Sequence, residues 1–213
     1  EQPMINFYAI LSGNYALQKD QWINAMDTVP TELEIYYHSG HDYNLDRMMK
    51  SMKASLQYYS THFSPYQYQQ LRIIEFPRYA DFAQSFPGTI PFSESIGFVL
   101  DIEDEKDVDM VFYITAHETA HQWWGMQIEA ANVPGRNMIL ESLAQYSAMM
   151  VLKENYPNEK IEQFLDMQLE NYLHKRNKET KKELPLSRVE NQDYIYYEKG
   201  AINFYTLQEY IGE

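Results

Sequence analysis

The chain has 213 residues and a formal net charge of −14, and 45% of its residues are hydrophobic and 15% aromatic. This composition excludes a disordered chain, and the negative charge argues against binding to nucleic acid or to an anionic membrane surface. Cysteine is absent, which excludes disulfide bonds and thiolate metal sites. No segment approaches the roughly 20 apolar residues of a membrane span. Both ends look cut from something longer, so we expect a fragment of a larger protein.

The first half of the chain carries the strand signals. Alternating apolar and polar residues predict a strand over 32–38, which Gly40 ends. Asn44 can cap a helix with one methionine-rich apolar face, made of Leu45, Met48, Met49, Met52, Leu56, Tyr59 and Phe63. Further strands are predicted over 71–76 and 95–100. The long, proline-containing connection between them is of a kind that is more often functional than idle.

The second half is helical in pattern. The acidic run over 101–109 is interpreted as a solvated loop, with Asp109 near a helix N-terminus. The predicted elements that follow are helices over about 110–125, 138–155 and 158–173, a charged surface connection over 174–183, and a last helix from about Lys199. We therefore predict an α+β fold, strand-rich over about 1–108 and helical over about 109–213.

The most informative stretch is residues 117–121, which read H-E-x-x-H inside a predicted helix. Residues four apart lie on one helix face, so His117 and His121 can bind a single metal ion. Glu118 can then lie beside a water molecule at that ion and accept its proton, the arrangement of zinc metallopeptidases. The alternative is an exposed helix that carries two histidines by chance.

A catalytic zinc ion needs a third protein ligand. Glu141 is the best candidate, because it opens the next predicted helix and a short connection can return it to the histidines. The alternative is a first-turn glutamate that the helix dipole stabilises.

Three separated segments resemble the aminopeptidase N family of zinc metallopeptidases, the gluzincins: HETAHQWWG at 117–125, LESLAQY at 140–146 and YEKG at 197–200. The resemblance implies a thermolysin-like catalytic domain over 1–213, in which an N-terminal mixed sheet packs on helices and a mainly helical half follows. It implies one zinc ion per chain, with Glu141 as the third ligand. Tyr197 would donate a hydrogen bond to the oxyanion.

A fourth segment is aligned with the family's Gly-x-Met-Glu-Asn strand, whose glutamate binds the free α-ammonium group of the substrate. Pro91 to Ser95 takes that place, which puts Glu94 at the anchoring position, although proline, serine and serine replace the family's glycine, methionine and asparagine. The implied reaction is removal of N-terminal residues from peptides. Two alternatives remain: an endopeptidase with the same zinc site, and a non-enzymatic domain that serves assembly of a larger membrane protein.

The resemblance also implies surroundings for the domain. Its partners would be a peptide substrate with a free N-terminus and flanking domains of the same parent protein. The wording of the motifs looks most like bacterial members joined to transporter-type membrane segments, which implies a membrane-associated parent with this domain outside the cytoplasm. The sequence leaves the compartment of the fragment itself open. His38 and His41 have ligand-like proximity, but they lie in a Gly-containing turn and are interpreted as surface residues. His62 and His174 carry no partner signal.

Overall fold

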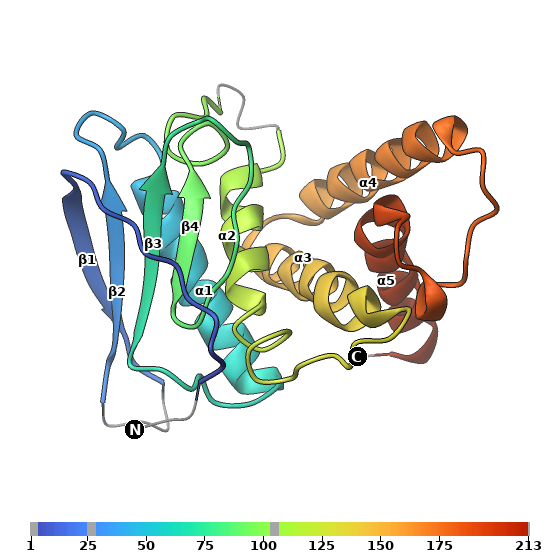
Figure 1. Cartoon of the computed structure of the whole chain (residues 1–213), viewed down its shortest axis with the longest axis horizontal. Coiled ribbons are helices and arrows are strands. Elements are labelled where there is room, and N and C mark those ends of the chain that lie inside the picture. Colours follow the sequence, from blue (N-terminus) through green and yellow to red (C-terminus); the bar gives the residue numbers. More distant parts are fainter. Residues whose placement is uncertain (1–3, 25–28, 103–106, 213) are drawn as a thin grey trace.

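The N-terminal half of the chain forms a four-stranded mixed sheet (Figure 1). The computed structural model describes residues 4–24, 29–102 and 107–212. The strands are β1 (Ala16–Trp22), β2 (Thr31–Tyr37), β3 (Gln70–Phe76) and β4 (Thr89–Ser93), in that order across the sheet. β1 is antiparallel to β2, whereas β2, β3 and β4 are parallel to one another.

One face of this sheet is apolar because residues two apart in a strand point to the same side. The fully buried side chains of the three parallel strands are Leu33, Ile35, Leu71, Ile73, Ile90 and Phe92. Helix α1 (Leu45–His62) packs on them through Met48, Met52 and Leu56, which are also fully buried. The methionine-rich face predicted for this helix is therefore core packing.

Helix α2 (Met110–Ala120) connects the sheet to the helical half (Figure 1). It is bound to α1 by two buried hydrogen bonds to its backbone: Ser51 Oγ donates to Phe112 O at 2.6 Å, and Tyr59 OH donates to Ala116 O at 3.0 Å. Asp109 caps its N-terminus and accepts a hydrogen bond from Phe112 N at 2.9 Å, as its position in the sequence predicted.

The remaining helices follow α2 in sequence and lie on its other side (Figure 1). They are α3 (Leu143–Asn155), α4 (Asn158–Lys178) and α5 (Gly200–Ile211), with a 3₁₀ turn η2 (Leu186–Arg188). Two short π-helical turns, η1 (Met138–Ser142) and η3 (Ile195–Lys199), lead directly into α3 and α5. Sheet first and helices afterwards confirm the α+β prediction.

One predicted strand is wrong. Residues 95–100 do not form a strand; β4 lies earlier, and Glu94 to Val99 turn back on themselves, with Val99 N donating to Glu94 O at 2.9 Å. Gly97 leaves room for the core beside this turn, since a Cβ there would lie 2.6 Å from Cδ1 of the buried Phe92 ring. The sequence did not predict β4 because Pro91 lies inside it, and proline is normally confined to edge strands. β4 is such an edge strand among the four named strands.

Helix ends also differ from the prediction. α2 ends at Ala120 rather than at Gly125, and α4 continues to Lys178 through part of the charged stretch predicted as a connection. Of the acidic run over 101–109, residues 103–106 lie outside the described residues. In the ranges that the structure describes, no helix is both long and apolar enough to cross a membrane.

Candidate active site

The last turn of α2 and its C-cap residue present two histidines, His117 and His121, to one point. Their Nε2 atoms are 3.1 Å apart, as expected for residues four apart on one helix face. The carbonyl oxygen of Trp124 lies 2.9 Å from Nδ1 of His121, so Nδ1 donates to it and Nε2 is left free to act as a ligand. Nearly every residue of α2 is buried, including His117 and Glu118, which are 8% and 5% exposed.

Glu141 joins the two histidines from the π-helical turn η1. Its Oε2 atom lies 3.6 Å from Nε2 of His117 and 3.5 Å from Nε2 of His121. Ligand atoms around a tetrahedral zinc ion, each about 2.0–2.1 Å from it, lie roughly 3.3–3.4 Å from one another. The three atoms therefore have the spacing of a zinc ligand set, and the structure assembles the three residues that the sequence nominated.

Two further observations fit a metal ion at this point. Oε2 of Glu141 and Nδ1 of His117 are buried, and neither has a hydrogen-bond partner among the described residues. Burial opposes the charged imidazolium, but the Glu141 carboxylate outweighs burial and raises the pKa of His121 to about 9. Burial also opposes ionisation of Glu141, yet the two histidines beside it hold its pKa well below the usual range. A cation can take the place of the shared proton.

Glu118 lies beside this cluster and is held by a residue that the sequence did not single out. The Ser85 hydroxyl is 3.1 Å from Oε2 of Glu118 and also contacts the Glu118 carbonyl oxygen. Ser85 belongs to a segment over 82–86 that runs antiparallel to β4, with Gln84 N donating to Pro91 O at 3.0 Å. This segment is part of the long connection whose length was the only available signal.

Tyr197 approaches from the other π-helical turn, η3. Its ring centroid is 6.4 Å from that of His117. Burial, and after it the Glu141 carboxylate, raises the pKa of Tyr197 well above its usual range, so the hydroxyl keeps its proton at neutral pH. The turns η1 and η3 touch directly, since Ser142 Oγ donates to Tyr196 O at 2.6 Å.

These groups open onto one cavity of about 800 Å³. Its lining comes from residues 5–7, the segment 82–85, the end of α2 with the turn after it, η1 and Tyr197. Arg136 and Glu129 also line it, and sequence reasoning assigned neither a role. The cavity is thus built from parts of the chain that are far apart in sequence.

Glu94, the predicted anchor for the substrate ammonium group, does not lie in this cavity. It follows the far end of β4, where Arg78 Nε donates to its Oε1 at 3.1 Å and His41 Nδ1 lies 3.8 Å from its Oε2. The start of β4 is the end that meets the active site, because Gly88 N donates to Gln122 Oε1 at 2.8 Å. The structure brings the other five predicted residues together and gives the anchoring role of Glu94 no support.

Two histidines and a glutamate around one point, with a second buried carboxylate beside them, are the arrangement typical of a gluzincin-type zinc metallopeptidase. Comparisons with known proteins agree with this class. The family model described as "Peptidase family M1 domain" matches residues 43–213. The chain belongs to peptidase family M1.

Two curated relatives are named as aminopeptidases. The chain is 31% identical over 166 residues to "Probable aminopeptidase 1" of Sulfurisphaera tokodaii, covering 74% of this chain and 21% of that protein. It is 26% identical over 173 residues to "Leucyl aminopeptidase" of Saccharolobus solfataricus, covering 78% of this chain and 22% of that protein. The chain thus spans about a fifth of the length of these relatives.

Solved structures show the same fold. The M1 zinc metallopeptidase of Deinococcus radiodurans superposes with a TM-score of 0.65 at 16% identity, covering 94% of this chain and 42% of that one. An E323A mutant of that protein, solved with a Tyr-Ser-Ala substrate, superposes with a TM-score of 0.61, also at 16% identity, covering 92% of this chain and 41% of that one.

Proposed function

We propose that this chain is the catalytic domain of a zinc aminopeptidase, with one zinc ion at the active site of each chain. The observation that carries the proposal is the convergence of His117, His121 and Glu141, whose ligand atoms lie 3.1–3.6 Å apart beside the buried carboxylate of Glu118. The non-enzymatic alternative has no use for a buried carboxylate that the Ser85 hydroxyl orients toward the same cavity.

A zinc ion held by these three residues would polarise the scissile carbonyl and lower the pKa of the attacking water toward neutrality. Glu118 accepts the proton of that water and passes it to the nitrogen of the leaving amine. Tyr197, which keeps its proton at neutral pH, donates a hydrogen bond to the oxygen that becomes negative. The products are a free amino acid and a peptide shortened by one residue.

Selection of the N-terminal residue of the substrate rests on relatives and not on a residue of the cavity. It is supported by the names of the two curated relatives, both aminopeptidases, and by the Tyr-Ser-Ala substrate found with the D. radiodurans enzyme. Glu94 does not contribute to the cavity. The endopeptidase alternative therefore differs from the proposal only in whether a free ammonium group is required.

The surroundings of the domain are proposed from the motif resemblance alone. Flanking domains of the parent protein would form further walls of the cavity. Among the described residues, the segment over 5–7 forms part of its lining. The parent would be bacterial and membrane-associated, with this domain outside the cytoplasm. Fractionation of cells that express the parent, with protease accessibility of the intact cells, tests this placement.

The activity is tested on the full-length protein with an amino-acid anilide. Glu118→Gln keeps the size of the side chain and removes the proton acceptor, so zinc content should stay at the wild-type value while kcat falls on the order of 100-fold or more. Glu159→Gln, the same substitution at an exposed position in the first turn of α4, is the matched control and should leave kcat unchanged.

Substrate form separates the two peptidase alternatives. A free N-terminus should be required, so an N-acetylated peptide of the same sequence should not be cleaved. Cleavage of the acetylated peptide would favour the endopeptidase. Full activity of Glu118→Gln, or activity that survives removal of zinc, would refute the proposed mechanism.

A further inference from the structure

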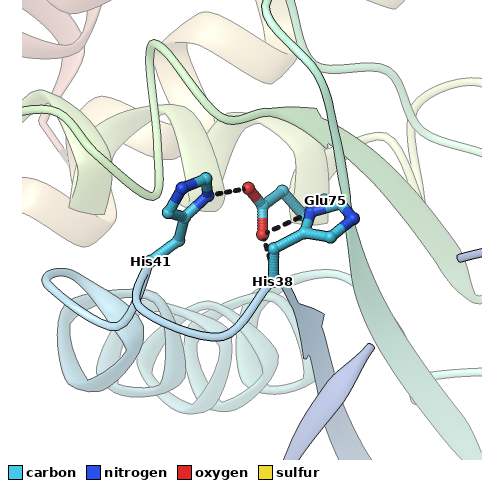
Figure 2. Close-up of side chains that lie close together, drawn as sticks. All are labelled: His38, His41 and Glu75. Atoms are coloured by element: carbon cyan, nitrogen blue, oxygen red, sulfur yellow. Dashed lines mark hydrogen bonds and ion pairs between the residues drawn. The ribbon is translucent and has the colours of Figure 1, made fainter. Parts of the chain in front are cut away.

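A second group of potential metal ligands lies at the opposite end of the sheet from the active site. His38 follows β2, His41 lies in the turn after it, and Glu75 is near the end of β3 (Figure 2). Because β2, β3 and β4 are parallel, their ends meet at one edge of the sheet. The length of β4, roughly 15 Å, lies between this edge and the end of the strand where Gly88 meets Gln122 beside the active site. The sequence predicts that the two histidines are surface residues, whereas in the structure they are partly buried and both contact Glu75.

Glu75 is unusual because its side chain is fully buried. It points to the same face of β3 as Leu71 and Ile73, which are core residues. A buried carboxylate is normally paired with a cation or bound to a metal ion. Among the described residues, no lysine or arginine contacts Glu75; its carboxylate meets only His38 and His41.

The contacts of Glu75 bring the three side chains to one point. Nδ1 of His41 lies 2.5 Å from its Oε1, and Nδ1 of His38 lies 3.2 Å from its Oε2. One ligand atom from each of the three residues lies within 4.8 Å of the others. The backbone N–H of His38 also donates to Oε2 of Glu75, the kind of outer hydrogen bond that orients a ligating carboxylate.

We propose that His38, His41 and Glu75 form a second site for a divalent transition-metal ion, with zinc as the fitting ion. Two imidazoles and one carboxylate are a donor set that suits zinc, and no thiolate is needed. The two imidazoles are 35% and 33% exposed, so an ion can enter from solvent and water can complete its coordination.

The surrounding charge favours a cation. The chain carries a net charge of −14, which raises the local concentration of cations at its surface. Oε2 of Glu94 lies 3.8 Å from Nδ1 of His41 and brings a second carboxylate to the site. Bound metal would link the ends of β2 and β3 to the turn before α1, so the site is structural and not catalytic.

Zinc counting tests the proposal on the full-length protein. The His117→Ala/His121→Ala variant removes the catalytic ligands, so any zinc that it keeps reports other sites whether or not the protein is a peptidase. In that background we expect adding His38→Ala/His41→Ala to remove one zinc equivalent, measured by titrating the metal-free protein with zinc chloride. Adding His62→Ala instead is the matched control, since His62 is an exposed histidine whose Nδ1 lies 2.9 Å from the Tyr58 carbonyl oxygen.

Cobalt provides an independent readout, because Co²⁺ in a nitrogen- and oxygen-ligated site has visible absorption that depends on its coordination. The band of the His117→Ala/His121→Ala background should disappear with His38→Ala/His41→Ala and persist with His62→Ala. If the double substitution prevents folding, Glu75→Gln decides, because glutamine keeps an acceptor for the His38 N–H while removing the charge. Equal zinc content and an unchanged cobalt band in the variants that fold would overturn the proposal.

Discussion

The contact between the two π-helical turns predicts a sharp effect of Gly200→Ala. Gly200 has ordinary helical dihedral angles, φ −60° and ψ −50°, so its backbone does not demand glycine. Space does: a Cβ on Gly200 would lie 2.3 Å from Oγ and 2.7 Å from Cβ of Ser142. Ser142 is fully buried and follows Glu141 directly, while Gly200 lies three residues after Tyr197. The added methyl group must therefore push apart the turns that position the third ligand and the oxyanion donor.

The expected magnitude combines two opposing terms. A methyl group inserted into a packed core costs about 1–3 kcal/mol, and alanine in a helix gains about 1 kcal/mol over glycine. The two terms together lower the free energy of unfolding by about 0–2 kcal/mol. A displacement of about 1 Å between catalytic groups can cost on the order of 100-fold in rate. We therefore expect a large fall in kcat/KM together with only a small fall in the free energy of unfolding.

The assay is a double-mutant cycle, with kcat/KM on an amino-acid anilide and thermal unfolding as the two readouts. Ser142→Gly removes both atoms that the new methyl group would meet, so Gly200→Ala/Ser142→Gly should recover activity that the single Gly200→Ala variant loses. Ser142→Ala is the matched comparison, because its Cβ stays and it should recover less. Contacting residues couple by about 0.5–3 kcal/mol. A Gly200→Ala enzyme with wild-type activity, or strictly additive substitutions, would refute the reasoning.

Four further predictions concern single groups. Ser85→Ala should lower kcat by roughly tenfold while zinc content stays unchanged, because Glu118 loses the hydroxyl that orients it. An unchanged kcat with an unchanged pH profile would show that Ser85 does not position Glu118. In the metal-free protein the pKa of His121 is raised from 6.5 to about 9, so zinc must displace a proton below that value. Apparent zinc affinity should then rise about tenfold per pH unit between pH 6.5 and 9 and level off above, as calorimetry can measure. By the same linkage, the raised pKa stabilises the metal-free fold below pH 6.5, and that stability should be lost as the pH rises to about 9, as urea unfolding at pH 6 and 9.5 would show. Glu94→Ala should leave the preference for a free N-terminus unchanged, since Glu94 lies with Arg78 outside the cavity; loss of that preference would restore its predicted role.

Helical parts of the molecule could be read from the sequence because helical neighbours are local. The four-residue spacing of His117 and His121 places them on one face of any α-helix, and the methionine-rich face of α1 needs only its own periodicity. Glu141 is a different case. Its approach to the histidines depends on the path of the chain between α2 and η1, and the resemblance to a known family identified it where spacing alone left two interpretations open.

Only the tertiary structure decided which distant residues meet. Ser85 reaches Glu118 because the segment before β4 folds back along that strand, and Glu94 moves away from the active site because β4 carries it to the opposite edge of the sheet. Glu75 looks in the sequence like an ordinary strand residue, and its partnership with His38 and His41 spans more than thirty positions. Strand pairing and loop closure depend on contacts between residues far apart in the chain, whereas the geometry of a helix repeats every few residues. The sequence by itself therefore determined the catalytic helix and the fold class, and the packing of the sheet edge and its neighbouring loops determined what lies beside that helix.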